Sequence, residues 1–136
     1  MKNFLYYCSL PDSMSSEELY LEFREFLEGF SRVKCNKTDS LRIILELSDR
    51  QWHTYTVLCD SLRKKIEGIL VSLWDGGDLA VAEDVIAITA RLGLVGVFEF
   101  FSTQDADNLS LEVAAEIRAA IAEFGDTVGD PYSGVR

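Results

Sequence analysis

The sequence predicts a single α+β domain in which a sheet of about four strands is covered by helices mainly on one face. Two kinds of segment lead to this prediction: some alternate with the period of two typical of strands, and others repeat apolar residues at spacings of three and four. Their order is strand, helix, two strands, helix, helix, strand, helix, which favours α+β over a doubly wound parallel sheet. With 136 residues, 48% of them apolar, the chain can bury its own core. We expect the domain to cover residues 1–125 and an irregular tail to cover residues 126–136.

Four segments have strand-like patterns. Phe4–Leu10 carries apolar residues on both faces, as an interior strand does. Arg32–Asn36 and Leu41–Leu47 alternate on either side of residues 37–40, which suit a hairpin loop. Val95–Phe101 reads as the fourth strand.

Four segments have helical patterns. Ser15 with Glu18 forms a predicted capping box, and Ser48 with Gln51 forms a second one at the start of a long helical stretch. Asp78 suits the N-cap of the next helix, which extends over residues 79–92, and the last helix is predicted over residues 110–124. The predicted core is apolar and comes from both kinds of element: Phe23, Phe26, Leu27, Ile43, Leu45, Leu62, Ile66, Ile69, Val85, Ile86, Ile117 and Ile121.

The cysteines and the N-terminus predict a cytoplasmic protein. Cys8, Cys35 and Cys59 are odd in number, have no CxxC spacing and lie among apolar residues, so we expect free, buried thiols in a reducing compartment. Residues 1–10 contain no signal-peptide pattern, and the longest apolar segments are too short and interrupted to span a membrane.

Charge is distributed very unevenly along the chain. Nearly all of the net charge of −10 belongs to residues 69–136, whereas residues 1–68 are close to neutral. Such a field repels phosphates and anionic lipids, so no direct nucleic-acid or membrane contact is expected. The basic run at residues 63–65 is interpreted as a solvated helix face, and the acidic half favours a basic protein partner.

No motif predicts catalysis, a cofactor or a metal site, so the protein is not expected to be an enzyme. His53 is the only histidine; a pair with Cys35 or Cys59 is the one nucleophilic arrangement available to it. Asp105 begins a loop faintly like a calcium loop, but its sixth position is Ser110 where that motif needs glycine. The turn at residues 75–78 lacks the lysine of a phosphate-binding loop and suits a connection between helices.

The sharpest candidate surface lies on the last predicted helix. At 100° per residue Glu112, Glu116 and Glu123 fall within about 40° of one another, away from the apolar face. No lysine follows four residues later to offset their repulsion. We therefore predict a partner-binding surface centred on these glutamates and supported by three aspartates, namely Asp75, Asp78 and Asp126.

In size, acidity, cytoplasmic character and lack of catalytic motifs the chain resembles bacterial immunity proteins of polymorphic or contact-dependent growth-inhibition toxins. The resemblance implies a cytoplasmic inhibitor that binds a cognate toxin, commonly a basic, nuclease-type domain, and masks its active site. Type III secretion chaperones, which are also small, acidic α+β proteins and bind an effector segment, are the alternative. An enzyme that uses its carboxylates is a third and weaker possibility. The sequence leaves the oligomeric state open.

Overall fold

The computed structural model of the protein contains helices and no strand among the residues that it describes, which are 2–32, 36–125 and 127–132. The predicted α+β class with a four-stranded sheet is therefore wrong. In chain order the elements are α1 (Phe4–Cys8), α2 (Ser16–Phe30), α3 (Lys37–Trp52), α4 (Asp60–Leu73), α5 (Leu79–Leu92), α6 (Val95–Ser102), the 3₁₀ turn η1 (Ala106–Asn108) and α7 (Leu111–Phe124).

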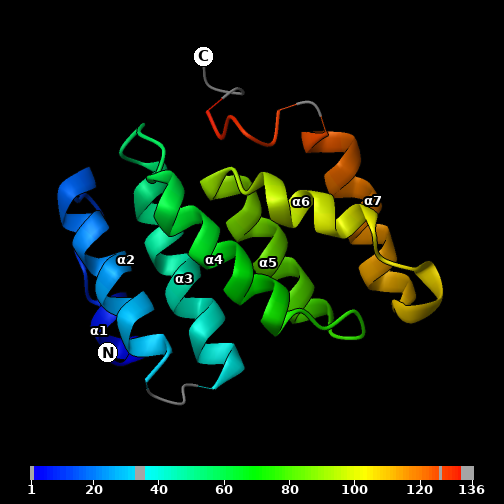
Figure 1. Cartoon of the computed structure of the whole chain (residues 1–136), viewed down its shortest axis with the longest axis horizontal. Helices are drawn as coiled ribbons and strands as arrows, with labels where there is room; N and C mark the ends of the chain where they lie inside the picture. Colours follow the sequence, from blue (N-terminus) through cyan, green and yellow to red (C-terminus); the bar gives the residue numbers. More distant parts are fainter. Residues whose placement is uncertain (1, 33–35, 126, 133–136) are drawn as a thin grey trace.

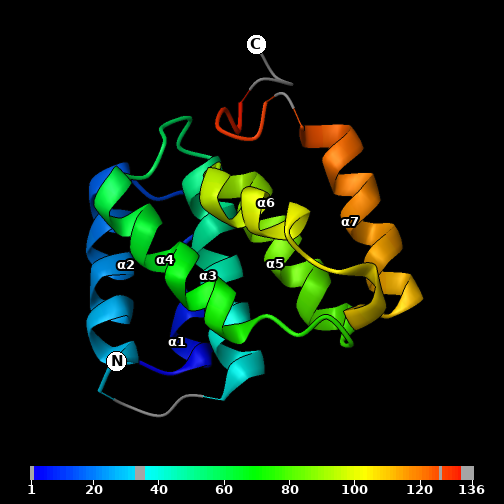
Figure 2. The same cartoon turned by 45° about the vertical axis from the view of Figure 1, so that its right-hand side comes forward.

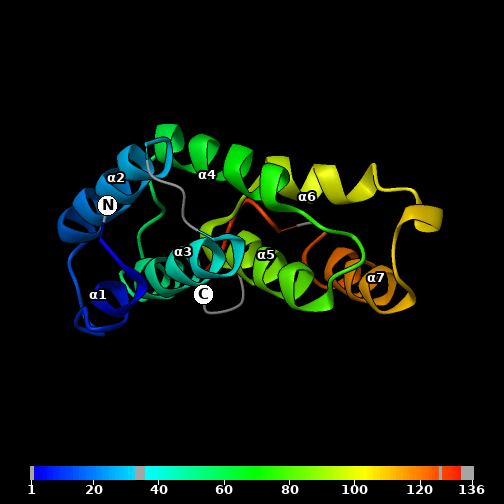
Figure 3. The same cartoon turned by 90° about the horizontal axis from the view of Figure 1, so that it is seen from below.

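The helices form two layers, and successive helices alternate between them. Figure 3 shows α2, α4 and α6 in one layer and α1, α3, α5 and α7 in the other. Within each layer the neighbours pack in chain order, so that α3 lies between α1 and α5, and α5 lies between α3 and α7. This alternation is the arrangement of helix pairs found in α-solenoids. It places α1 and α2 at one end of the molecule and α7 at the other (Figures 1 and 2).

The central position of α3 explains the error over Leu41–Leu47. Asn36 caps this helix by accepting a hydrogen bond from the backbone N–H of Asp39 at 2.7 Å, so residues 37–40 form its first turn rather than a hairpin loop. Because α3 contacts helices on several sides, it buries residues around most of its circumference, and the 3.6-residue period is obscured. The predicted capping box at Ser48 is also wrong, since Ser48 lies inside α3 and donates to the carbonyl oxygen of Ile44.

The predicted strand Phe4–Leu10 is replaced by the short helix α1. Asn3 caps it through the N–H of Tyr6, and Tyr7 is fully buried with its ring edge-on to Phe26. The aromatic residues of this segment give it the alternating apolar pattern of a strand, although the segment is helical. Arg32–Asn36, the other predicted strand of this half, falls partly outside the described residues; Asn36 itself is the cap of α3.

The fourth predicted strand is the helix α6, and its cap comes from another helix. Leu94 precedes α6 and makes no side-chain cap. Instead the Glu67 carboxylate of α4 accepts from the N–H groups of Gly96 at 2.6 Å and Val97 at 3.3 Å. Because the capping group is distant in the sequence, the residues around Val95 do not reveal it. The β-branched and aromatic residues of this segment instead favoured a strand.

Several local predictions are confirmed. Ser15 and Glu18 form the capping box of α2, and Asp78 caps α5. The structure also shows that Gly93 ends α5 with a left-handed φ of +69°. Ser110 caps the last helix. Seven residues of the predicted core are buried: Phe23, Phe26, Ile43, Leu62, Ile66, Val85 and Ile117. Four more are partly buried, namely Leu27, Leu45, Ile69 and Ile86. Ile121 is 39% exposed, so its placement in the core is wrong.

The thiol prediction needs correction. Cys8 and Cys59 are free, as expected, but both are exposed rather than buried, because Cys8 ends α1 at the surface and Cys59 occupies the N-cap of α4. Cys35 lies outside the described residues. None of the helices in the described part of the chain is both long and apolar enough to cross a membrane.

The segment after α7 returns across the molecule to the end of α3 (Figures 1 and 2). Tyr132 is 5% exposed, and its hydroxyl donates to the carbonyl oxygens of Gln51 and Thr56 at 3.1 and 3.0 Å. Its ring stacks on Trp52, whose indole N–H donates to the carbonyl oxygen of Pro131. Residues 127–132 contain no helix, yet these contacts dock them firmly.

Candidate functional site

The candidate surface is the outer side of α7, at the end of the two-layer stack. Val113, Ala114, Ile117 and Ala120 form the buried side of this helix, which packs on α5. The opposite side has no helix against it among the described residues (Figure 2). The three predicted glutamates, Glu112, Glu116 and Glu123, are all exposed there.

These glutamates have no cationic partner within the described part of the chain. Some carboxylates elsewhere in the described chain pair with a nearby base: Glu25 with Lys2 at 2.8 Å, and Asp49 with Arg91 at 3.0 Å. No ion pair of this kind involves Glu112, Glu116 or Glu123. Their negative charge is consequently available to a partner, and it extends along about 16 Å of helix at 1.5 Å per residue.

Beside the glutamates lies a strip of small and apolar side chains that sequence reasoning missed. Leu111 is 90% exposed, the largest exposed fraction among the exposed large hydrophobic residues of the described chain. Ala115, Ala119 and Ala122 are also exposed. On a helical wheel they occupy the centre of the open side, with the glutamates along one edge and Arg118 along the other. The same wheel that grouped the glutamates could have shown this strip.

The supporting aspartates are placed near the start of α7. The backbone N–H of Ser110 donates to the carbonyl oxygen of Gly76 at 2.9 Å, so the α4–α5 turn touches the N-terminus of α7. Asp75 and Asp78 are exposed in this turn. The structure thus brings four of the predicted residues to one region, with Glu123 at the far end of the same helix; Asp126 lies outside the described residues.

Both aspartates also have structural roles. One Asp75 oxygen accepts from the Gly77 N–H, and the other lies 4.0 Å from the Lys37 ammonium. Asp78 caps α5 by accepting from the N–H of Val81 at 3.3 Å. Because these contacts engage part of each carboxylate, Asp75 and Asp78 offer less free charge to a partner than the α7 glutamates do.

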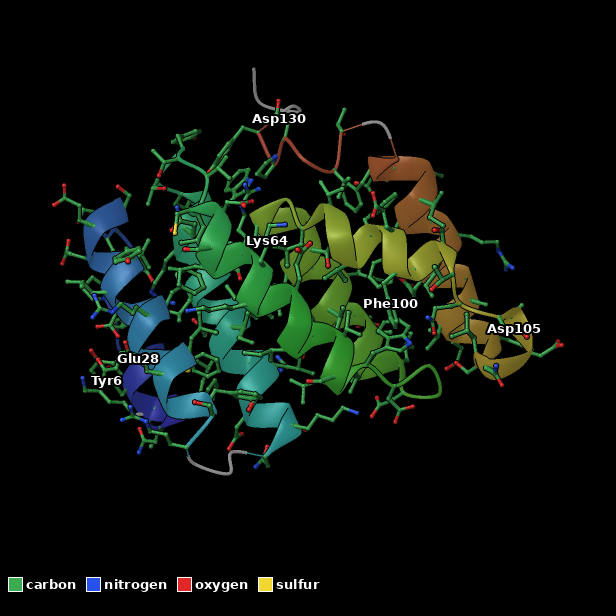
Figure 4. The ribbon with its side chains drawn as sticks, viewed as in Figure 1. Tyr6, Glu28, Lys64, Phe100, Asp105 and Asp130 are labelled. Atoms are coloured by element: carbon green, nitrogen blue, oxygen red, sulfur yellow. The ribbon has the colours of Figure 1, made fainter. Side chains whose placement is uncertain are left out.

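Further acidic side chains flank this end of the molecule. Figure 4 shows Asp105 projecting at the end formed by η1 and α7, far from Glu28 on α2. Asp105 accepts from the N–H of Asp107 and so shapes the turn η1. Trp74, in contrast, is partly buried against Phe100 and Phe101, with ring centroids 6.0 and 5.4 Å apart. It supports the helix packing at this end rather than projecting toward a partner.

The candidate groups for catalysis are dispersed. His53 is exposed, and its Nδ1 lies 2.7 Å from the carbonyl oxygen of Asp49. Cys59 contacts the Ser61 hydroxyl, and no contact between Cys59 and His53 is present. No three His, Cys, Asp or Glu side chains converge as metal ligands within residues 2–32, 36–125 and 127–132.

Perturbed ionisation occurs away from α7. Burial raises the pKa of Asp84 on α5, although Arg42 at 3.4 Å acts in the opposite direction and Glu83 acts in the same one. The hydrogen bond to Glu22 raises the pKa of Tyr6. These groups are part of helix packing and do not share a pocket with the acidic surface.

Comparisons of the chain with protein-family models, with curated proteins and with solved structures gave no match. Function is therefore inferred from the geometry and charge of this chain.

Proposed function

We propose that this protein is a stoichiometric inhibitor of the immunity-protein type, which binds a basic toxin domain and masks its active site. The observation that carries the proposal is the unpaired acidic edge of α7, where Glu112, Glu116 and Glu123 are exposed without a cationic partner among the described residues. A nuclease-type toxin needs a cationic groove to hold phosphates. A row of carboxylates complements such a groove and competes with the substrate for it.

The open side of α7 has a shape suited to a protein partner. Ala115 and Ala119 at its centre allow another surface to approach the helix axis closely, and Leu111 offers an apolar contact at one end. The glutamates along the edge add long-range attraction and fix the register. Apolar contact and charge complementarity would thus act on adjacent strips of one helix.

The chaperone alternative was based on small size, acidity and a shared α+β fold, and the helical architecture of the described residues removes the last of these. The inhibitor hypothesis depends on charge and exposure, which do not change with the fold class. We therefore prefer the inhibitor proposal, in which the protein is located in the cytoplasm with its toxin.

The test is a triple charge reversal, Glu112, Glu116 and Glu123 to Lys, measured against the toxin encoded by the neighbouring gene. The exposed side chains make no contacts that fold the chain, so the variant should melt within a few degrees of the wild type. Three exposed pairs lost and replaced by repulsion should weaken binding by about 100-fold or more. Protection of cells that express the toxin should fall accordingly.

A matched control changes the same net charge away from α7. Asp12, Asp49 and Asp60 are exposed, and two of them make surface ion pairs, Asp49 with Arg91 and Asp60 with Arg63. Their replacement by Lys should leave binding within about threefold of the wild type. Equal losses from the two triple variants would show that net charge alone matters, and unchanged binding in the α7 variant would reject the proposed surface.

A further inference from the structure

A groove extends between α2 and α4, at the end of the molecule opposite α7. It consists of two adjoining hollows of about 650 and 440 Å³ that share Tyr20. The two helices run in the same direction, with α3 antiparallel to both (Figure 1). Measured from Cys59 to Ser72 along α4, the groove is about 20 Å long.

The walls of the groove are apolar at the bottom and polar at the rim. Leu27, Leu62 and Ile69 line the larger hollow, while Leu21 and Val57 line the smaller one. Leu21 and Val57 are 59% and 44% exposed, which is unusual for residues of this type. The groove is long and open on its outer side, so it would leave a small molecule largely in water. An amphipathic helix, which buries only one face, fits this shape.

The charges at the two ends of the groove differ. In the larger hollow Arg24 is neutralised by Glu28 at 3.1 Å, whereas Lys65 has no ion pair among the described residues. In the smaller hollow Glu17 is exposed and likewise without an ion pair. An occupant should therefore carry an acidic residue near Lys65 and a basic residue near Glu17.

A buried acceptor lies at the Glu17 end. Gln51 is 2% exposed and lines the smaller hollow. Its Nε2 donates to the carbonyl oxygen of Thr56 at 2.8 Å, which fixes the orientation of the amide and leaves Oε1 without a hydrogen-bond partner. A buried acceptor without a donor is costly, so a basic side chain entering here would find two acceptors, Gln51 Oε1 and the Glu17 carboxylate.

We propose that the α2–α4 groove is a docking site for an amphipathic helix of a partner protein, bound antiparallel to α2 and α4. An acidic residue in the N-terminal part of that helix meets Lys65, and a basic residue in its C-terminal part meets Glu17 and Gln51. This charge order also suits the occupant's own helix dipole. The site is separate from the α7 surface and does not depend on the inhibitor proposal.

Gly68 provides an unusually clean test. It lies on α4 in the larger hollow, and a Cβ built there meets no atom within 4 Å. Gly68→Leu should fill the groove and, because glycine is a poor helix former, raise the melting temperature by about 2–5 °C. Gly68→Ala adds only a methyl group and is the stabilised control. Ala80→Leu adds comparable bulk at an exposed position of α5 and is the control for location.

The probe is a fluorescein-labelled synthetic amphipathic peptide of about four helical turns, with leucine and alanine on one face, one glutamate near its N-terminus and one arginine near its C-terminus. A second peptide has these two charges exchanged. Fluorescence polarisation with the full-length protein should show about tenfold tighter binding of the first peptide. Lys65→Glu should reduce or invert that preference, and amide chemical shifts should change along α2 and α4.

Gly68→Leu should weaken binding of the first peptide by tenfold or more while melting above the wild type, and Gly68→Ala and Ala80→Leu should bind normally. The proposal would be overturned by equal binding of both peptides, by wild-type affinity in Gly68→Leu, or by loss of binding in Ala80→Leu. Absence of measurable binding by either peptide would also overturn it.

Discussion

Replacement of Tyr132 measures how strongly the C-terminal segment is held to the helices. Tyr132→Phe removes a hydroxyl that donates to the carbonyl oxygens of Gln51 and Thr56. Neither acceptor is left alone, because the N–H of Thr54 also donates to Gln51 O and the Gln51 amide also donates to Thr56 O. The loss should therefore stay near the ordinary value for one hydrogen bond, about 1 kcal/mol in the free energy of unfolding.

Tyr132→Ala should cost more, because it also removes a buried ring. That ring stacks on Trp52 and on Tyr55, with centroids 5.9 and 5.6 Å apart, and Tyr55 is held in the left-handed region with a φ of +57°. Truncation of a buried aromatic residue typically costs about 3–5 kcal/mol. Here residues 127–132 lie outside the helices and can detach without unfolding them, so we expect a smaller loss of about 2–3 kcal/mol.

Urea unfolding followed by circular dichroism gives the free energies, and tryptophan emission in a Trp74→Phe background reports on Trp52 alone. Detachment should shift that emission to the red in Tyr132→Ala but not in Tyr132→Phe. Burial raises the pKa of Tyr132, so its contribution is complete below the ordinary tyrosine value of about 10 and is lost as pH rises through the folded value. Unchanged stability and emission in Tyr132→Ala would refute this account of the segment.

Three further results follow from the packing. Glu67→Ala on α4 removes the group that caps α6 and should lower the free energy of unfolding by about 0.5–2 kcal/mol. Urea titration measures this loss, and Glu99→Ala on the exposed side of α6 is the control. Ile66→Ala should cost about 2–5 kcal/mol, since Ile66 is fully buried; a loss below 1 kcal/mol would show that α4 is oriented wrongly. Cys8 and Cys59 should both react with a thiol reagent in the folded protein, because both are exposed. Cys8 should react more slowly at neutral pH, since partial desolvation and the nearby Glu46 carboxylate raise its pKa; protection of either thiol, read by mass spectrometry, would contradict its exposed position.

Where local chemistry decides the structure, the sequence was sufficient. Ser15, Asp78 and Ser110 each accept a hydrogen bond from a backbone N–H three residues later, and this pattern is visible in the sequence. Gly93 supplies the left-handed residue that ends α5. These helices also have one clear apolar side, so both their limits and most of their buried residues could be predicted.

The errors arose where distant parts of the chain decide the structure. The segment Leu41–Leu47 is buried on nearly all sides in the middle of a layer, which hides its helical period. Val95 begins a helix whose cap, Glu67, lies about thirty residues earlier. The segment that begins at Val95 is also rich in residues with high β propensity, and tertiary contacts outweigh that preference.

For the candidate site, the sequence located the charges but not their surroundings. The wheel placed Glu112, Glu116 and Glu123 together and exposed, and the structure agrees. It could not show that α7 ends a layer and leaves its outer side open, because that depends on which helices pack together. The α2–α4 groove could not be predicted for the same reason: its walls come from segments that are distant in the sequence.

The most direct test of the central claim is the ionic-strength dependence of the association rate constant between this protein and its basic toxin. If the acidic edge of α7 steers the encounter, the rate should approach about 10⁸ M⁻¹s⁻¹ at low salt and fall by at least tenfold as the Debye length shortens from about 30 Å at 0.01 M to 8 Å at 0.15 M. The Lys variant at Glu112, Glu116 and Glu123 should lose this dependence and stay near 10⁵–10⁶ M⁻¹s⁻¹ or below. A rate for the wild type that does not change with salt, or one that the charge reversal leaves intact, would contradict the account.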